Sequence, residues 1–257
     1  MPIATGRYLY GLIHAGQDVD FGCIGLEHDG KPGRVYTLRE GSLGAVVSDL
    51  PARQKLLPLR KNLDPHHKVI REVMKTTTIV PMTFGHVVKN GDEIARTLRR
   101  NRDGIQAQLA RVEGRVEMGL KVKWDVENIF EYFMDAYPDL KAFRDQIFGR
   151  SSAPSQAEKI ELGRMFEDQL NREREEQTQR AMDMFQPCCA EVKASPPKSE
   201  KMVMDLAFLV DRDALKPFEE RIYQVAATFP AQYIFDYSGP WAPFNFVDLD
   251  LQSTAAA

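Results

Sequence analysis

The residues best suited to acid–base or metal chemistry stand together in one short stretch. Asp64, His66, His67 and Glu72 fall within nine residues, but the H-E-x-x-H pattern of zinc enzymes is absent. Adjacent histidines on a helix point about 100° apart, so they do not easily serve one metal ion. We therefore interpret Asp64 as a helix cap with Pro65 in the first turn, followed by one buried and one exposed histidine.

A glycine-rich stretch has the spacing of a phosphate-binding loop but lacks its other requirements. Residues 25–32 read Gly-Leu-Glu-His-Asp-Gly-Lys-Pro, so Pro32 stands where a hydroxyl side chain would hold magnesium. The pattern also predicts a strand after this point, whereas a phosphate loop needs the free N–H groups of a helix start. We interpret the stretch as a turn.

No other constellation indicates catalysis. The nucleophile motif G-x-S-x-G is absent, and the cysteines Cys23, Cys188 and Cys189 form no C-x-x-C pair. An odd, sparse cysteine count is typical of the reducing cytoplasm. The sequence therefore indicates a protein that is not an enzyme and has no catalytic, cofactor-binding or metal-binding residues.

A row of arginines, Arg96, Arg99, Arg100 and Arg102, raises the question of nucleic-acid binding. Acidic residues share the same helical segment, and no aromatic residues interleave with the arginines. The formal net charge of −3 gives no general attraction to phosphate backbones. A solvated basic face is the favoured interpretation.

The C-terminal segment is unusually aromatic. Six aromatic residues fall in the fourteen from Tyr233 to Phe246, and two prolines in this stretch disfavour a helix. Such side chains bury large areas when they dock. We expect an arm that seals two domains, with a partner-binding strip as the alternative. The candidate interdomain or partner contacts are Tyr237, Trp241, Phe244 and Phe246.

Changes in hydrophobic period predict an α+β protein of two domains. Short strands joined by glycine turns make up the first fifty residues, and helical periods follow from Asp64 and again after Gly91. Between these two helical segments, residues 76–88 read as an edge strand or two short strands. Residues 116–124 alternate as a half-buried strand. The order of elements beyond it resembles a ferredoxin-like unit with enlarged helical material at one connection. We therefore predict an N-terminal α+β domain over 1–113, a ferredoxin-like domain over 114–238 and an aromatic tail over 239–257.

Two segments of the second domain carry further expectations. A capping box, Ser155 with Glu158, starts a helix that runs to about Phe185 and is almost wholly polar over 167–180. We expect that polar middle to be exposed and locally mobile. Residues 191–200, which include two adjacent prolines, read as a flexible connector.

Composition bounds the class of protein. The 257 residues are 43% hydrophobic and 28% charged, which is typical of a soluble globular chain. Eighteen consecutive apolar residues occur nowhere, and the N-terminus lacks a secretory signal pattern. We expect a cytoplasmic protein without a membrane span.

Several segments together resemble the gas vesicle protein F/L family (GvpL/GvpF). They are Tyr-Leu-Tyr-Gly-Leu-Ile from Tyr8, Leu-Gly-Ala-Val-Val-Ser-Asp-Leu from Leu43, His66 through Met74, and Val-Pro-Met-Thr-Phe-Gly from Val80. Near the end stand Leu-Ala-Phe-Leu-Val from Leu206 and Gly-Pro-Trp-Ala-Pro-Phe-Asn-Phe-Val from Gly239. The resemblance covers nearly the whole chain, and the last segment is the most specific.

The resemblance implies a non-enzymatic accessory protein, a minor component of the gas vesicle. Its expected fold has two α+β domains, the C-terminal one a modified ferredoxin-like fold. Its expected partner is the hydrophobic shell protein, gas vesicle protein A, whose aggregation it would limit during vesicle nucleation, together with other gas vesicle accessory proteins. No nucleic-acid partner is expected.

The alternative from another class is a ferredoxin-like module that binds a small molecule or RNA. Such modules expose aromatic residues on sheet strands beside basic residues. Trp124 is the aromatic residue in the strand 116–124, and Phe208 lies in an apolar run that should be buried. The residues therefore favour the accessory protein.

Overall fold

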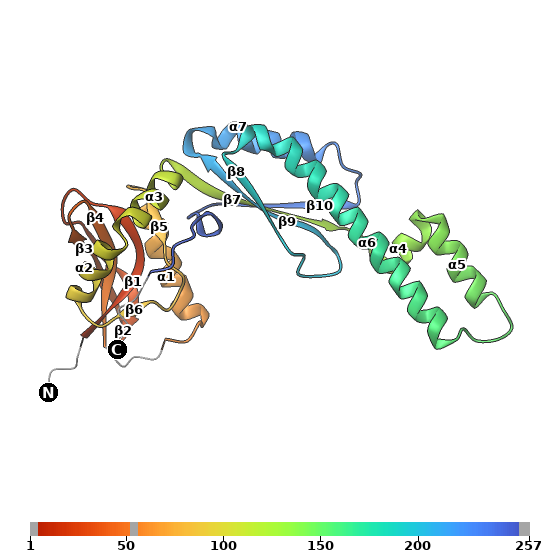
Figure 1. Ribbon diagram of the computed structural model, residues 1–257, viewed down its shortest axis with the longest axis horizontal. Coiled ribbons are helices and arrows are strands. Elements are labelled where there is room, and N and C mark those ends of the chain that lie inside the picture. The colour runs from red at the N-terminus through yellow and green to blue at the C-terminus, as the bar shows by residue number, and fades with distance from the viewer. Residues whose placement is uncertain (1–4, 52–55, 252–257) are drawn as a thin grey trace. The chain divides into compact units, whose positions relative to one another are not determined.

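The computed structural model describes residues 5–51 and 56–251 and divides the chain into two units (Figure 1). The first unit consists of the residues up to Glu117 together with those from Pro240 onward, and the second is Met118–Gly239. The content is mixed helix and antiparallel sheet, as the sequence predicts. The division after Glu117 lies inside one strand and the division after Gly239 inside another, so each strand continues through the division.

The first unit is built on a six-stranded sheet. Its strands are β1 (Thr5–His14), β2 (Asp20–His28), β3 (Lys31–Glu40), β4 (Leu43–Pro51), β5 (Ile79–Pro81) and β6 (Val87–Val88). The path runs β2-β3-β4-β1-β5, with β6 also paired to β1. The central strand β4 is buried at nearly every position, as its run of aliphatic residues requires.

The stretch that resembles a phosphate loop is a β-hairpin. Asp29 and Gly30 join β2 to β3 with positive φ angles of 50° and 74°. Two successive residues with positive φ are the signature of a tight hairpin turn that matches strand twist, and Asp-Gly is a preferred pair for it. The interpretation of residues 25–32 as a turn therefore holds for its centre, with strand on both sides.

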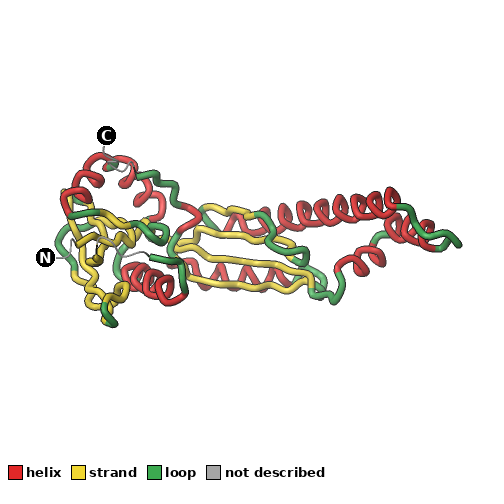
Figure 2. The backbone as a smooth tube through the Cα atoms, turned by 90° about the horizontal axis from the view of Figure 1, so that it is seen from below, coloured by secondary structure: helices red, strands yellow, loops and turns green. Residues whose placement is uncertain are grey.

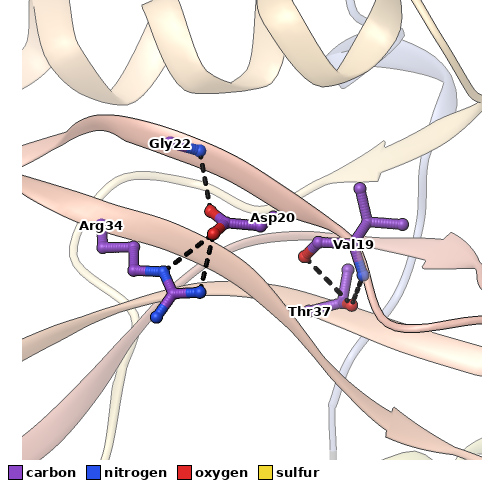
Figure 3. A network of polar contacts seen from close by, with 5 residues as sticks. All are labelled: Val19, Asp20, Gly22, Arg34 and Thr37. Atoms are coloured by element: carbon purple, nitrogen blue, oxygen red, sulfur yellow. Dashed lines mark hydrogen bonds and ion pairs between the residues drawn. The ribbon is translucent and has the colours of Figure 1, made fainter.

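Side chains fix the start of this hairpin (Figure 3). Asp20 accepts hydrogen bonds from Gly22 N (2.9 Å) and from Arg34 Nε and Nη2 (3.0 and 2.7 Å). Val19 N donates to Thr37 Oγ1 at 2.8 Å. The Arg34 guanidinium holds the pKa of the Asp20 carboxyl below its usual range. These contacts join β2, which the sequence analysis did not predict as a strand, to β3.

Three helices complete the first unit: α1 (Arg60–Met74), α2 (Gly91–Arg100) and α3 (Arg102–Val112). The start of α1 differs from the prediction, because the helix begins four residues before Asp64 and encloses Pro65. Asp64 does not cap the helix but pairs with Arg60 one turn earlier, Nε to Oδ2 at 3.3 Å. Asn90 caps α2 by accepting from Glu93 N at 2.9 Å.

The second unit has a four-stranded sheet in the order β10-β7-β9-β8. The strands are β7 (Arg115–Trp124), β8 (Glu191–Ser195), β9 (Met202–Asp211) and β10 (Tyr233–Trp241). The interpretation of residues 191–200 as a flexible connector is wrong for its first half, which pairs antiparallel with β9 as β8. An edge strand that is only half-buried lacks the hydrophobic pattern by which strands are recognised.

Four helices belong to this unit: α4 (Ile129–Ala136), α5 (Pro138–Phe148), α6 (Gln156–Phe185) and α7 (Leu215–Ala226). Helices α6 and α7 pack on the sheet through Phe185 and Phe218, which both contact Phe208 of β9. The N-terminal half of α6 extends past the sheet and packs on α4 and α5 (Figure 2). The predicted capping box is present, with Ser155 and Glu158 exchanging hydrogen bonds.

The polar middle of α6 is exposed over much of 167–180, as expected, but its half-buried residues are anchored by polar contacts. Glu173 accepts hydrogen bonds from Tyr137 Oη (2.6 Å), Tyr233 Oη (3.0 Å) and Gln177 Nε2 (3.0 Å). Burial and the contact with Glu173 raise the pKa of Tyr137 to about 12. Arg174 donates to the carbonyl oxygens of Met202 (3.0 Å) and two neighbouring residues. Two adjacent side chains of α6 therefore join the helix to the α4–α5 pair, β10 and the turn before β9.

Removal of the Glu173 carboxylate should destabilise the second unit. Hydrogen bonds to a charged group contribute about 1.5–3 kcal/mol, so Glu173→Ala should lower the free energy of unfolding by about 2–3 kcal/mol. Urea denaturation followed by far-UV circular dichroism measures the change. The exposed neighbour Glu175 supplies the control, and Glu175→Ala should stay within about 0.5 kcal/mol of the parent. Equal effects of the two substitutions would show that the contacts of Glu173 do not stabilise the unit.

Candidate partner-binding surface

The four candidate contact residues are divided between the two units. Tyr237 lies on β10 within the second unit, where its ring contacts Phe218 at a centroid distance of 6.3 Å. Trp241, Phe244 and Phe246 belong to the first unit. Trp241 is the last residue of β10, so the predicted tail from residue 239 begins inside a strand. Phe244 and Phe246 form a short 3-10 turn.

The tail is fixed to the first unit at Asn245 and Phe246. Glu117, only 7% exposed, accepts hydrogen bonds from Asn245 N (2.8 Å) and Asn245 Nδ2 (2.7 Å). Phe246 is fully buried and Ala242 nearly so. This part of the tail therefore contributes to the core of the first unit.

An aromatic cluster continues from the tail into that core. Phe244 contacts the ring of His67 at 6.0 Å, and His67 contacts His66 at 5.3 Å. His66 lies against Tyr8 and Tyr10 of β1, at 5.7 and 5.8 Å. His66 is buried and His67 exposed, which confirms that part of the interpretation of α1.

The buried histidine is neutral and hydrogen-bonded to a tyrosine. Tyr8 Oη accepts from Gly85 N at 3.1 Å and forms a 2.9 Å hydrogen bond with His66 Nδ1. Burial, reinforced by the neighbouring His67, lowers the pKa of His66 to about 4. Burial also raises the pKa of Tyr8. Both groups are therefore uncharged near neutral pH, and the arrangement is a structural hydrogen bond between neutral partners.

An open groove of about 750 Å³ lies beside this cluster in the first unit. Apolar side chains from four places in the chain line it: Ile24 of β2, Pro32 of β3, Ile70 of α1, and Trp241 with Phe244 of the tail. Charged residues of both signs, among them Glu27, Lys68 and Arg71, also line it. Trp241 keeps 46% of its surface exposed, which is unusual for the largest apolar side chain. We name this the Trp241 groove.

Comparison with known proteins places the whole chain in one family. The family model described as "Gas vesicle synthesis protein GvpL/GvpF" matches residues 6–248. The chain belongs to the GvpL/GvpF family. It is 30% identical to gas vesicle protein F of Nostoc sp. (strain PCC 7120) over 250 residues, covering 96% of this chain and all of that one. It is 28% identical to gas vesicle protein F of Haloferax mediterranei over 97% of this chain and 96% of that one.

Solved structures of the GvpL/GvpF family share the fold. The crystal structure of GvpF from Anabaena sp. PCC7120 superposes with a TM-score of 0.82 at 27% identity, covering 96% of this chain and 99% of that one. GvpF from Microcystis aeruginosa gives 0.77 at 23% identity, over 95% and 99% of the two chains.

Membership of the GvpL/GvpF family gives this chain a role in gas vesicle formation and an association with gas vesicle components. The family is one of structural and accessory proteins and is not known for catalysis. The alternative of a small-molecule or RNA-binding module is not favoured by these relatives. Within the part of the chain that the structure describes, none of the helices is both long and apolar enough to cross a bilayer.

The lowered pKa of His66 should make the first unit sensitive to mild acid. The His66 imidazole has a pKa near 6.5 in the unfolded chain, whereas its pKa in the folded chain is about 4. The neutral histidine therefore contributes fully above about pH 6.5, and this contribution, about 3 kcal/mol, is lost as the pH falls to about 4.

Urea unfolding between pH 7.5 and 4.5 measures that loss. His66→Gln should lower the free energy of unfolding at neutral pH and make it decline less as the pH falls. His67→Gln, at the exposed neighbour, should leave the decline of the parent chain unchanged. A decline of the same size in His66→Gln and the parent would mean that other groups titrate.

Two aromatic residues of the C-terminal tail, Phe246 and Trp241, should differ sharply in their contribution to stability. Phe246→Ala removes a fully buried ring and should cost about 3–5 kcal/mol. Trp241→Ala removes a half-exposed ring and should cost about 1 kcal/mol or less. Thermal and urea unfolding of the two variants test this. A large loss in Trp241→Ala would identify Trp241 as a core residue and not as a surface available to a partner.

Proposed function

We propose that this chain is a non-enzymatic accessory protein of gas vesicle assembly that binds the hydrophobic shell protein, gas vesicle protein A, and limits its aggregation during vesicle nucleation. The observation that supports this function best is the Trp241 groove, where a large apolar side chain stays exposed beside an open surface that other apolar side chains help to line. Trp is enriched among the residues that dominate binding energy at protein interfaces.

The chemistry of the partner fits such a surface. A shell protein that lines a gas space must present apolar surface before it assembles, and exposed apolar surface aggregates. A protein that covers this surface needs a complementary apolar groove and no reaction chemistry. Charged residues around the groove, such as Lys68 and Arg71, supply the polar rim that protein interfaces carry.

We also propose that the second unit is a modified ferredoxin-like domain with an enlarged helical insertion. Its four strands, counted along the chain, stand in the order 4-1-3-2, with helices after the first and the third strand. The insertion consists of α4, α5 and the N-terminal half of α6. In this proposal the two units are taken as the two predicted domains.

For the predicted tail, 239–257, the proposal uses only its contacts with the first unit. Its contacts described above are with the first unit, and residues 252–257 lie outside the described residues. The packing of the tail between the domains stays a prediction. We expect the protein in the cytoplasm and on the gas vesicle, in company with the shell protein and other accessory proteins.

Trp241 should be needed for binding the shell protein but not for folding. When the shell protein is co-expressed with Trp241→Ala, the amount of soluble shell protein that co-purifies should be about tenfold lower than with the parent chain. A tenfold loss corresponds to about 1.4 kcal/mol of binding free energy. Tyr223, an aromatic residue of α7 that is 68% exposed, gives the matched control, and Tyr223→Ala should bind as the parent does.

The parent chain provides the decisive comparison. Equal aggregation of the shell protein with and without the parent chain would refute the proposed function. Unchanged binding by Trp241→Ala, with a parent chain that binds, would place the contact elsewhere on the molecule.

A further inference from the structure

The last described residues of the tail lie as a strap over a second apolar groove in the first unit. We name Val247–Leu251 the strap. Its residues alternate in burial, with Val247, Leu249 and Leu251 half-buried and Asp248 and Asp250 exposed. This is the period of an extended chain with one apolar face.

The groove beneath the strap is aliphatic and incompletely filled. A cavity of about 560 Å³ stays open next to the strap. Leu9 and Leu12 of β1, Ile94 and Leu98 of α2, and the exposed Val87 line it together with the strap itself. A concave, mostly apolar site of this size is typical of binding sites.

The strap is held more weakly than the turn that precedes it. Asp248 N donates to Gln108 Oε1 at 3.3 Å, a longer bond than the 2.7 and 2.8 Å bonds of Asn245 to Glu117. The chain is therefore fixed as far as Phe246 and can open beyond it.

We propose that the strap is an exchangeable cover, and that the groove beneath it receives an extended segment of the shell protein with apolar side chains at alternate positions. This inference rests on the proposed function and adds to it a second contact surface and its regulation. The strap itself indicates which kind of segment the groove accepts, since its own half-buried apolar side chains alternate with exposed ones.

The two grooves share one lining residue. Phe244 lines both the Trp241 groove and the groove under the strap. In this proposal a partner bound at Trp241 reaches the second groove past Phe244 and competes with the strap. Binding then requires the open state, so the apparent affinity is reduced by the fraction of molecules in which the strap is closed.

Two substitutions at half-exposed or exposed positions separate release of the strap from loss of the groove. Leu249→Asp places a charge on the apolar face of the strap and should leave the groove open. Val87→Asp places a charge at the groove, at a side chain that is 43% exposed and can be replaced without unfolding the unit. Ile234→Asp, at an exposed aliphatic position of β10 in the second unit, is the control.

Titration of the purified full-length variants onto immobilised shell protein measures the apparent Kd. If the strap covers the groove in about nine molecules of ten, Leu249→Asp should lower the apparent Kd about tenfold. Val87→Asp should raise it, and the double variant should lose the gain of Leu249→Asp. Ile234→Asp should match the parent.

The outcomes distinguish this inference from the proposed function. Absence of binding by the parent chain would contradict the proposed function itself. Binding by the parent that neither Leu249→Asp nor Val87→Asp changes, while Trp241→Ala abolishes it, would overturn the strap inference and leave the proposed function in place. A gain from Leu249→Asp that persists in the double variant would also overturn it, because the gain would not depend on the groove.

Discussion

The buried carboxylate of Glu117 is the constraint from which the functional surface follows. Burial of a carboxylate is costly unless hydrogen bonds compensate it, and Asn245 supplies two of them, from its backbone and its side chain. The tail must therefore return to this point of β7. Once Asn245 is placed there, its neighbours follow: Phe246 enters the core, Phe244 reaches His67, and Trp241 remains half-exposed.

The parts of the fold that could be predicted from the sequence are those with a strong period or a local signal. The alternation over 116–124, the capping box at Ser155 and the division of roles between His66 and His67 each depend on side chains close in sequence. The strands β2 and β8 were missed because both are edge strands with few buried side chains. An edge strand is specified by its neighbour more than by its own residues.

The candidate surface could be predicted only in composition. The six aromatic residues near the C-terminus predict a contact segment. Which of their rings is buried depends on the hydrogen bond between Asn245 and Glu117, which are 128 residues apart in the sequence. The same limit applies to the middle of α6. Glu173 and Arg174 look like solvated charges in the sequence, and their partners lie on other elements, at Tyr137, Tyr233 and the turn before β9. Polar anchoring over such separations leaves no periodic signal.

The two sets of contacts on α6 restrict how this helix can change in length. Toward its N-terminus, Phe166 packs on Phe133 of α4, and toward its C-terminus, Phe185 packs on Phe208 of β9. Inserting one residue between these sites would rotate one set by about 100° relative to the other and shift it by about 1.5 Å. Both sets are kept in phase when close to a whole number of turns is added or removed, for example about seven residues for two turns. Single-residue insertions and deletions should therefore be confined to the loops at the two ends of α6.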